Sequence, residues 1–216
     1  SDLGFYLIKE AMATVSNMPF EKLVAEKYYR PMGLPTMGYL PLKRFSPEVI
    51  APTEDDRAFR KQLLRGDVHD QGAAMLGGVS GHAGLFSNAF DMAVIMQLYL
   101  DGGVYGGRRY LERETIEEFT TTQFPLNDNR RGIGFDKPLL DYHEDGPTCR
   151  SASHDSFGHS GFTGTYAWAD PANGLIYIFL SNRVCPDAGN SRLMEYDIRT
   201  NLHQVFYDAL EDLAKP

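Results

Sequence analysis

The sequence predicts an α+β fold in which an antiparallel sheet is flanked by helices. Residues 162–168 alternate between two sets, Phe162, Gly164, Tyr166 and Trp168 against Thr163, Thr165 and Ala167, and residues 175–182 form a second, more apolar run. A period of two with β-branched and aromatic residues is typical of strands. The Asp-Pro and Asn-Gly dipeptides between the two runs favour a turn, so we expect a hairpin. Residues 194–213 carry an apolar stripe at helical spacing, and we expect this helix to pack on the sheet.

The chain before the hairpin is predicted to be mainly helical. An apolar helix pattern begins at Asp2, and a second helix begins near Ser16 and ends near Pro31. Prolines are too dense over residues 31–52 for a long helix, so we expect an irregular segment there. A short charged helix is predicted at residues 55–64.

A glycine-rich stretch precedes one more predicted helix. Ser87 or Asn88 can cap this helix, and Gly102 and Gly103 are expected to end it. A short helix is also predicted around residues 115–119. We therefore describe the chain as a mainly helical part, residues 1–130, followed by closing strands and a terminal helix, residues 131–216.

Composition excludes several classes of function. The 216 residues have a hydrophobic content of 43%, which is typical of globular proteins. The net charge of −8 argues against nucleic-acid binding through bulk electrostatics. No apolar run is long enough to span a bilayer. Cys149 and Cys185 are too few for a disulfide framework, and the histidine spacings match no metal-ligand pattern. We expect no metal and no cofactor.

Three motifs resemble the superfamily of serine β-lactamases and penicillin-binding proteins. His159-Ser160-Gly161 resembles the Lys-Thr-Gly element, which stands at the head of a paired strand in that superfamily. Residues 68–87 resemble its glycine-rich approach and Ala-Gly-Leu-Phe-Ser segment, and Ser1 to Ile8 resembles its Tyr-Ser-Asn motif without the tyrosine. Residues 132–135 resemble the Gly-x-Gly strand that begins its last sheet, and residues 136–156 are expected to form a loop. The resemblance covers nearly the whole chain and implies the C-terminal part of a β-lactamase/transpeptidase-like fold.

The resemblance implies roles around the His-Ser-Gly element. His159 would offer a hydrogen bond or, if protonated, a positive charge to a substrate carboxylate. Ser160 would offer a hydroxyl, and Gly161 would leave the strand bare so that substrate can lie beside it. The backbone N–H of Phe162 would be one of two oxyanion-hole donors. Without the resemblance, His159 would be read as an ordinary strand histidine.

Two further residues are assigned to the same cleft by the resemblance. Asp2 takes the place of the usual asparagine in the second motif, and His82 lies in the glycine-rich loop, where it either packs or takes part in function. We expect Asp2, His82 and His159 to gather around one cleft. No serine in the chain has a lysine three positions later, so the Ser-x-x-Lys nucleophile motif is absent from these residues.

The resemblance implies that the intact protein is a serine hydrolase that forms an acyl-enzyme on an amide or ester. Its substrate would be a β-lactam, a cell-wall peptide or an ester, and the 216 residues alone would be inactive. The resemblance further implies an envelope protein, periplasmic or extracellular, with an N-acetylglucosaminidase domain fused upstream. The alternative is a non-catalytic binding module that keeps the fold, and a Ser-x-x-Lys motif upstream would discriminate between them.

Overall fold

The chain divides into two compact units. The computed structural model describes residues 2–213. One unit contains Ser1–Asp91 and Asn182–Asn190, and the other contains Met92–Ser181 and Ser191–Pro216; we call them the first and the second unit. No helix within residues 2–213 is both long and apolar enough to cross a bilayer.

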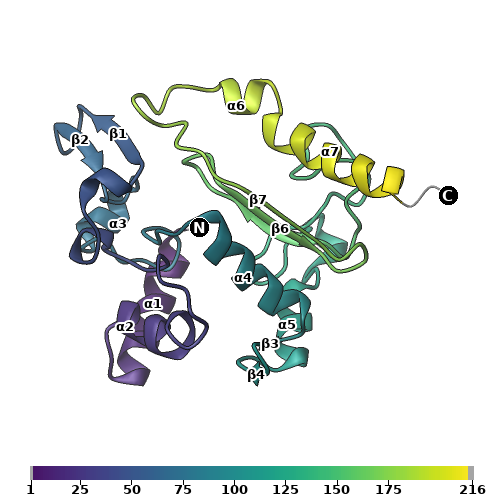
Figure 1. The fold of residues 1–216 in the computed structure, drawn as a ribbon, viewed down its shortest axis with the longest axis horizontal. Helices are drawn as coiled ribbons and strands as arrows, with labels where there is room; N and C mark the ends of the chain where they lie inside the picture. The colour runs from purple at the N-terminus through teal and green to yellow at the C-terminus, as the bar shows by residue number, and fades with distance from the viewer. Residues whose placement is uncertain (1, 214–216) are drawn as a thin grey trace. The chain divides into compact units, whose positions relative to one another are not determined.

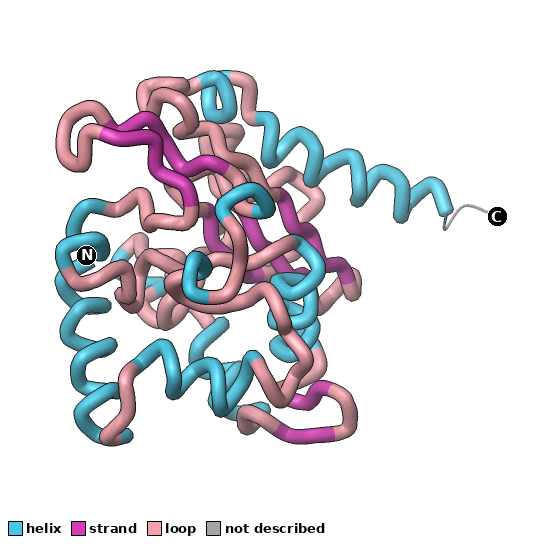
Figure 2. The backbone as a smooth tube through the Cα atoms, turned by 60° about the vertical axis from the view of Figure 1, so that its left-hand side comes forward, coloured by secondary structure: helices cyan, strands magenta, loops and turns pink. Residues whose placement is uncertain are grey.

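The first unit combines helices with a two-stranded antiparallel hairpin (Figure 2). Its elements are α1 (Asp2–Ser16), α2 (Phe20–Val24), the π-helix η1 (Ala25–Tyr29), the 3₁₀ helices η2 (Pro41–Lys43) and η3 (Pro47–Val49), β1 (Pro52–Asp56), β2 (Gln62–Arg65) and α3 (Gln71–Met75). The two helices that we predicted for residues 2–31 are confirmed, because α1 begins at Asp2 and α2 continues directly into η1.

The charged helix that we predicted at residues 55–64 is wrong, because this segment forms the β1–β2 hairpin. The Asp56 carboxylate accepts hydrogen bonds from the backbone N–H groups of Ala58, Phe59 and Arg60 at distances between 2.8 and 3.2 Å. Such bonds compete with helix formation and close a turn. The Arg60 side chain also donates to Asp56, and this bond, with the N–H of Phe59, lowers the pKa of Asp56 to about 2.

The second unit is built around a three-stranded antiparallel sheet of order β5-β6-β7. Its elements are the larger part of α4 (Ala89–Leu100), then β3 (Val104–Tyr105), β4 (Arg108–Arg109), α5 (Arg113–Thr120), the 3₁₀ helix η4 (Pro125–Asn127), β5 (Phe157–Ser160), β6 (Tyr166–Asp170), β7 (Leu175–Phe179), α6 (Arg192–Glu195) and α7 (Ile198–Leu213). The predicted helices after Asn88 and around residues 115–119 are confirmed as α4 and α5. The Asn88 side chain accepts from the N–H of Asp91 at 2.8 Å and so caps α4.

Helices cover both faces of this sheet (Figure 1). On one face, the His203 ring of α7 stacks on Tyr177 of β7 with ring centroids 4.6 Å apart. On the other face, Met96 of α4 packs with Phe157 and Ala169. Because neighbouring residues of a strand point to opposite faces, the alternating pattern of β6 supplies both layers. The predicted antiparallel hairpin with the terminal helix packed on its sheet is confirmed.

A buried carboxylate joins the β6–β7 turn to α7. Asp170 is 1% exposed and accepts hydrogen bonds from Ser153, from Asn173 in the turn and, at 2.5 Å, from the Tyr207 hydroxyl. Burial acts to raise the pKa of Asp170, but these hydrogen bonds outweigh it and hold the pKa below its usual value. The carboxylate therefore fixes α7 over the hairpin.

Residues 162–165 do not belong to a strand, so the strand that we predicted over 162–168 is correct only from Tyr166. The N–H of Gly161 donates to the carbonyl of Thr165 at 2.8 Å, and the N–H of Gly164 donates to the carbonyl of Gly161 at 3.0 Å. Gly164 has a φ of +104°, in the region that favours glycine. The alternating pattern thus contains a turn between two antiparallel strands, β5 and β6.

Two further boundaries differ from the prediction. Residues 132–135 form no strand, and the neighbouring Asp136 makes only an isolated bridge with Gly158. The single helix that we predicted for residues 194–213 is divided into α6 and α7, with Asp197 between them at a φ of +46°. The loop predicted at residues 136–156 is confirmed as irregular structure.

Candidate active site

The His-Ser-Gly segment lies at the exposed end of β5. The register pairs His159 with Ala167 and Ser160 with Tyr166, so the two side chains project from opposite faces of the sheet. Both are exposed. β5 is an edge strand. Its outer edge makes an isolated bridge between Gly158 and Asp136, and no strand among residues 2–213 pairs with the rest of that edge. An unpaired edge is a template on which an extended peptide can add.

His159 is bound to an arginine that the sequence analysis did not single out. Arg131 Nη1 lies 3.0 Å from His159 Nε2, while His159 Nδ1 lies 2.7 Å from the carbonyl oxygen of Ser160. The Arg131 guanidinium also lies 3.6 Å from the buried carboxylate of Asp136. The sequence gives only a weak signal for this contact, because an arginine beside loop glycines, as Arg131 is beside Gly132, is usually interpreted as a solvent-exposed charge.

The turn after β5 contains the other two residues assigned by the Lys-Thr-Gly resemblance. A Cβ atom added at Gly161 would meet the Thr165 hydroxyl, so a larger residue at this position would have to displace the Thr165 side chain. The sequence analysis gave a different reason for a glycine here, an open path for substrate. Phe162 follows in the turn with its side chain 63% exposed. The turn thus presents the backbone of Phe162 beside the His-Ser-Gly segment.

In the first unit, His82 is packed and hydrogen-bonded within the glycine-rich loop. Its Nδ1 lies 3.0 Å from the Ser80 hydroxyl and its Nε2 lies 3.1 Å from the Asp70 carboxylate. The ring makes an edge contact with Tyr6 of α1, with centroids 5.0 Å apart. Desolvation, followed by the charges of Asp70 and Asp2, raises the pKa of Tyr6 above its ordinary value. The loop and α1 therefore form one polar cluster.

Asp2 belongs to the same cluster. Asp2, Asp70 and His82 each place one possible ligand atom within 4.8 Å of the other two. Asp70 also caps α3 by accepting from the N–H of Ala73 at 2.6 Å. Ala73 and Ser80 are further partners of Asp70 and His82, so contacts within the protein hold both side chains in place. Asp70 and Tyr6 are members that the sequence analysis missed.

The structure therefore brings the predicted site residues together in two sets. Asp2 and His82 share the cluster of the first unit, whereas His159, Ser160, Gly161 and Phe162 share the end of β5 in the second unit. The expectation that Asp2, His82 and His159 line one cleft stays a prediction.

Comparison with known proteins identifies the family. Residues 1–198 match the family model described as Beta-lactamase. A protein of Escherichia coli strain K12, named as a candidate D-alanyl-D-alanine carboxypeptidase, is 38% identical over 196 residues, which are 85% of this chain and 44% of that protein. A Salmonella enteritidis protein with the same name is 34% identical, covering 89% of this chain and 47% of the relative. The chain thus spans about half the length of the curated relatives that it matches.

Solved structures of low sequence identity share the fold. A β-lactamase of Mycobacterium bovis aligns with a TM-score of 0.60 at 22% identity, covering 97% of this chain and 62% of its own. A penicillin-binding protein homologue of Caulobacter crescentus aligns with a TM-score of 0.56 at 21% identity, covering 86% and 52%. These alignments support the β-lactamase/transpeptidase-like architecture that the three motifs predicted. With a matching model over residues 1–198 and a relative at 38% identity, the chain belongs to the Beta-lactamase family of serine hydrolases.

Proposed function

We propose that this chain forms one wall of the active site of a serine hydrolase that cleaves peptides ending in D-alanyl-D-alanine through an acyl-enzyme. The observation that carries the proposal is the exposed His-Ser-Gly segment at an unpaired strand edge, in a chain 38% identical to a protein named as a D-alanyl-D-alanine carboxypeptidase candidate. An unpaired edge suits a peptide substrate, because the substrate backbone can pair with it.

The residues at the end of β5 have distinct proposed roles. His159 and Ser160 contact the substrate, and Gly161 sets the turn that follows. The backbone N–H of Phe162 donates to the oxyanion of the tetrahedral intermediate, together with the N–H of the nucleophilic serine. In acyl transfer the serine hydroxyl attacks the carbonyl carbon, its proton passes to a neighbouring base, and the amine leaves after it accepts a proton.

The nucleophile is proposed to lie outside these residues. No serine of the chain is followed by a lysine three positions later. In serine proteases whose catalytic triad has been removed, binding and oxyanion stabilisation alone still accelerate the reaction about 10³- to 10⁴-fold over the rate in water. The residual rate enhancement would be smaller here, since one of the two oxyanion donors belongs to the nucleophilic serine outside these residues. We therefore expect the 216 residues alone to be inactive.

The family motif supports further proposals about the whole protein. In the superfamily that the motifs resemble, the elements corresponding to those of Asp2 and His82 line the substrate cleft. We therefore propose that both residues face the substrate. A substrate of cell-wall origin would place the protein in the cell envelope, periplasmic or extracellular. An N-acetylglucosaminidase domain upstream would supply a second activity on the same polymer. The reaction proposed here requires no metal or cofactor.

The test compares the full-length protein with the 216-residue chain. Each is incubated with a D-alanyl-D-alanine peptide, an activated ester, a chromogenic β-lactam and a serine-directed fluorophosphonate probe. We expect hydrolysis and covalent labelling in the full-length protein only. Stoichiometric labelling of a serine within the 216 residues would contradict the proposed location of the nucleophile. Peptide binding without labelling or hydrolysis in the full-length protein would favour a non-catalytic binding module.

A further inference from the structure

We propose that Asp2, Asp70 and His82 form a binding site for a zinc ion. The site lies within the first unit, where it joins the start of α1, the residue that caps α3 and the glycine-rich loop. The inference goes beyond the proposed function and does not rest on it, because the ion would hold these three segments together and the proposed hydrolysis needs no metal. Histidine spacing gave no sign of such a site, since the ligands come from segments that are far apart in the sequence.

The Nε2 atom of His82 has the properties of a metal ligand. The atom is buried, and no group among residues 2–213 forms a hydrogen bond with it. Asp70 Oδ1 lies 3.1 Å away as an ion-pair contact that lacks hydrogen-bond geometry. Zinc binds such atoms at about 2.0 to 2.1 Å, so two ligands of a tetrahedral ion lie about 3.3 Å apart. The separation of the two atoms therefore suits a shared ion, which would also satisfy the buried nitrogen.

The two carboxylates supply oxygen ligands and the matching charge. Asp2, Asp70 and His82 each place one possible ligand atom within 4.8 Å of the other two. No lysine or arginine among residues 2–213 forms an ion pair with either carboxylate. With a neutral imidazole the group carries a charge of −2, which one divalent cation would neutralise. Asp2 is exposed, so its side chain can turn toward the ion and the site can be reached from solvent.

Neighbouring groups hold the ligands as the surroundings of metal sites do. His82 Nδ1 lies 3.0 Å from the hydroxyl of the fully buried Ser80, so Nδ1 can donate its hydrogen while Nε2 presents its lone pair. Asp70 accepts from the backbone N–H of Ala73 at 2.6 Å, and ligating carboxylates are hydrogen-bonded in this way. Both buried ligands are thus oriented by contacts within the protein.

The donor set favours zinc over magnesium or calcium. Magnesium and calcium take oxygen ligands, whereas zinc binds imidazole nitrogen together with carboxylate oxygen. Zinc sites with three protein ligands keep a fourth position for water. One imidazole and two carboxylates match this pattern, and the exposed side of the group leaves room for the water.

The experiment uses the full-length protein after its metals have been removed with a chelator and dialysis. Calorimetric titrations with Zn²⁺ and with Mg²⁺ are carried out on wild type, Asp2→Asn, Asp70→Asn and Ser80→Ala. Asparagine caps helices about as well as aspartate, so Asp70→Asn should keep α3. Asparagine is also the usual residue at the position of Asp2 in the superfamily that the motifs resemble, so Asp2→Asn should fold.

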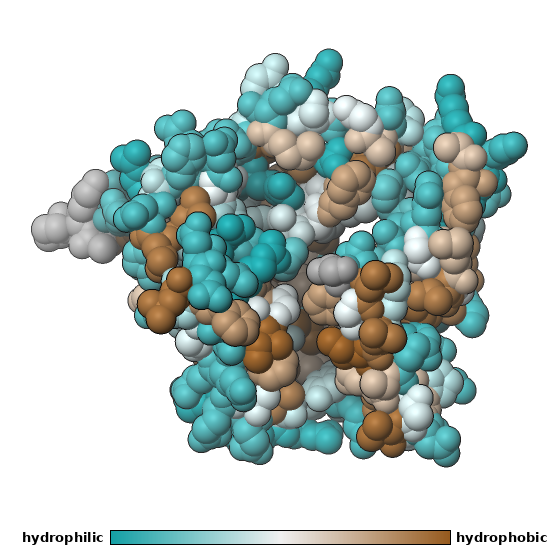
Figure 3. All heavy atoms as spheres, turned by 180° about the vertical axis from the view of Figure 1, so that it is seen from behind, coloured by the Kyte–Doolittle hydropathy of each residue, from teal (hydrophilic) through white to brown (hydrophobic). Residues whose placement is uncertain are grey.

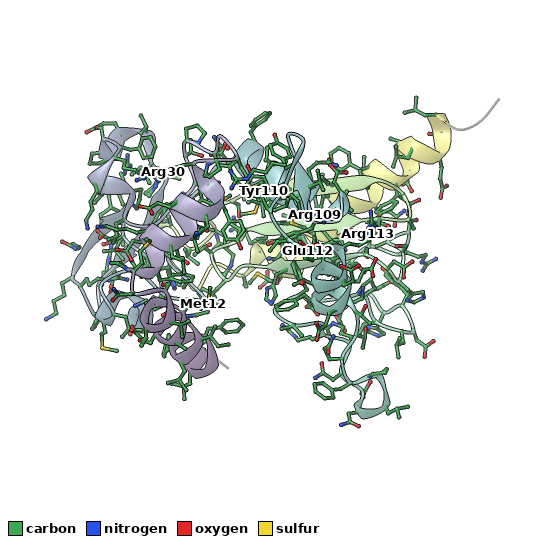
Figure 4. The ribbon with its side chains drawn as sticks, turned by 90° about the horizontal axis from the view of Figure 1, so that it is seen from below. Met12, Arg30, Arg109, Tyr110, Glu112 and Arg113 are labelled. Carbon is green, nitrogen blue, oxygen red and sulfur yellow. The ribbon has the colours of Figure 1, made fainter. Side chains whose placement is uncertain are left out.

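The matched controls are His143→Gln and Glu112→Gln. His143 Nδ1 lies 3.4 Å from the Asp145 carboxylate, but no third ligand atom joins this pair among residues 2–213. Glu112 is an exposed carboxylate of the second unit, at the start of α5 (Figure 4). The two variants therefore remove an imidazole and a carboxylate outside the proposed site.

We expect wild type to bind one Zn²⁺ per chain at this site, more tightly than Mg²⁺. Ser80→Ala should weaken Zn²⁺ binding by about 10- to 100-fold, the range for loss of a group that orients a ligand. Asp2→Asn and Asp70→Asn remove ligand charge and should weaken it by at least about 100-fold. Both controls should bind as wild type does. Zn²⁺ should also raise the unfolding temperature of wild type and not that of Asp70→Asn.

Wild-type protein that binds no Zn²⁺, or that binds Mg²⁺ more tightly, would overturn the inference. Equal Zn²⁺ affinity in wild type, Asp2→Asn and Asp70→Asn would also overturn it, because the ion would then be bound elsewhere. If Asp70→Asn does not fold, the exposed Asp2→Asn variant decides between these outcomes.

Discussion

His203 shows at the scale of one residue how packing sets a protonation state. The side chain is 1% exposed between α7 and the sheet, and its Nδ1 has no hydrogen-bond partner among residues 2–213. Burial lowers the pKa of His203 to about 4, against the opposing effect of the Asp170 carboxylate. The imidazole is therefore neutral when it stacks on Tyr177.

A pH dependence of stability follows from His203. The unfolded chain binds a proton at this histidine below about pH 6.5, whereas the folded chain resists protonation until about pH 4. The unfolded state thus binds more protons within this window, and the free energy of unfolding should fall as the pH is lowered through it. His203→Phe should flatten this part of the curve in urea denaturation followed by circular dichroism.

The control for His203 is His143→Gln, because the side chain of His143 is 69% exposed. This variant should keep the wild-type dependence between about pH 6.5 and pH 4. A wild-type stability that is constant over that window, or that is flattened equally by His143→Gln, would contradict the assignment to His203.

At the scale of an element, β5 depends on a close approach to β6. A Cβ atom added at Gly158 would clash with the carbonyl of Ala167 and the ring of Trp168, which is 1% exposed. Gly158→Ala should therefore force the two strands apart and cost about 1 to 3 kcal/mol of unfolding free energy, as overpacking does in other cores. Because the displaced strand carries His159 and Ser160, substrate binding should also weaken.

Gly4→Ala is the matched control for Gly158→Ala. No atom lies within 4 Å of a Cβ added at Gly4, which lies inside α1. Since alanine is the better helix former, this variant should be neutral or more stable by up to about 1 kcal/mol. Thermal unfolding distinguishes the two results, and a Gly158→Ala variant as stable as wild type would show that β5 can move without cost.

At the scale of the whole molecule, the exposed apolar surface of α1 is the feature with the clearest consequence. No residue of α1 is buried, and Leu3, Leu7 and Val15 are 67%, 72% and 89% exposed. Figure 3 shows apolar side chains along this helix. Contiguous apolar surface of this kind favours association in water.

We therefore expect the isolated 216-residue chain to self-associate as its concentration rises. Light scattering after size-exclusion chromatography measures the mass. The double variant Leu3→Lys with Leu7→Lys should shift the mass toward the monomer, because it replaces apolar surface with charge. Leu126→Lys, at a residue of η4 that is 97% exposed, should not. A wild-type chain that stays monomeric at every concentration would contradict this prediction.

Local sequence signals were sufficient to predict several elements of the fold. The alternation in β6 and β7, the Asp-Pro and Asn-Gly turn, the apolar stripe of α7 and the Asn88 cap of α4 each depend on residues a few positions apart. Periodicity and capping act over such short distances, so these elements could be predicted. The motifs at residues 68–87 and 157–168 also indicated the family, and the comparison with the family model confirmed it.

Contacts between chemical groups that are distant in the sequence depend on the three-dimensional fold. The pair of Arg131 and His159 joins residues 28 positions apart, and the cluster of Asp2, Asp70 and His82 joins α1 to a distant loop. Neither can be read from spacing, because the intervening chain can fold in many ways. The hairpin at residues 55–64 and the turn at residues 161–165 were missed for a different reason, because local side-chain and backbone hydrogen bonds outweighed the pattern of hydrophobicity and charge.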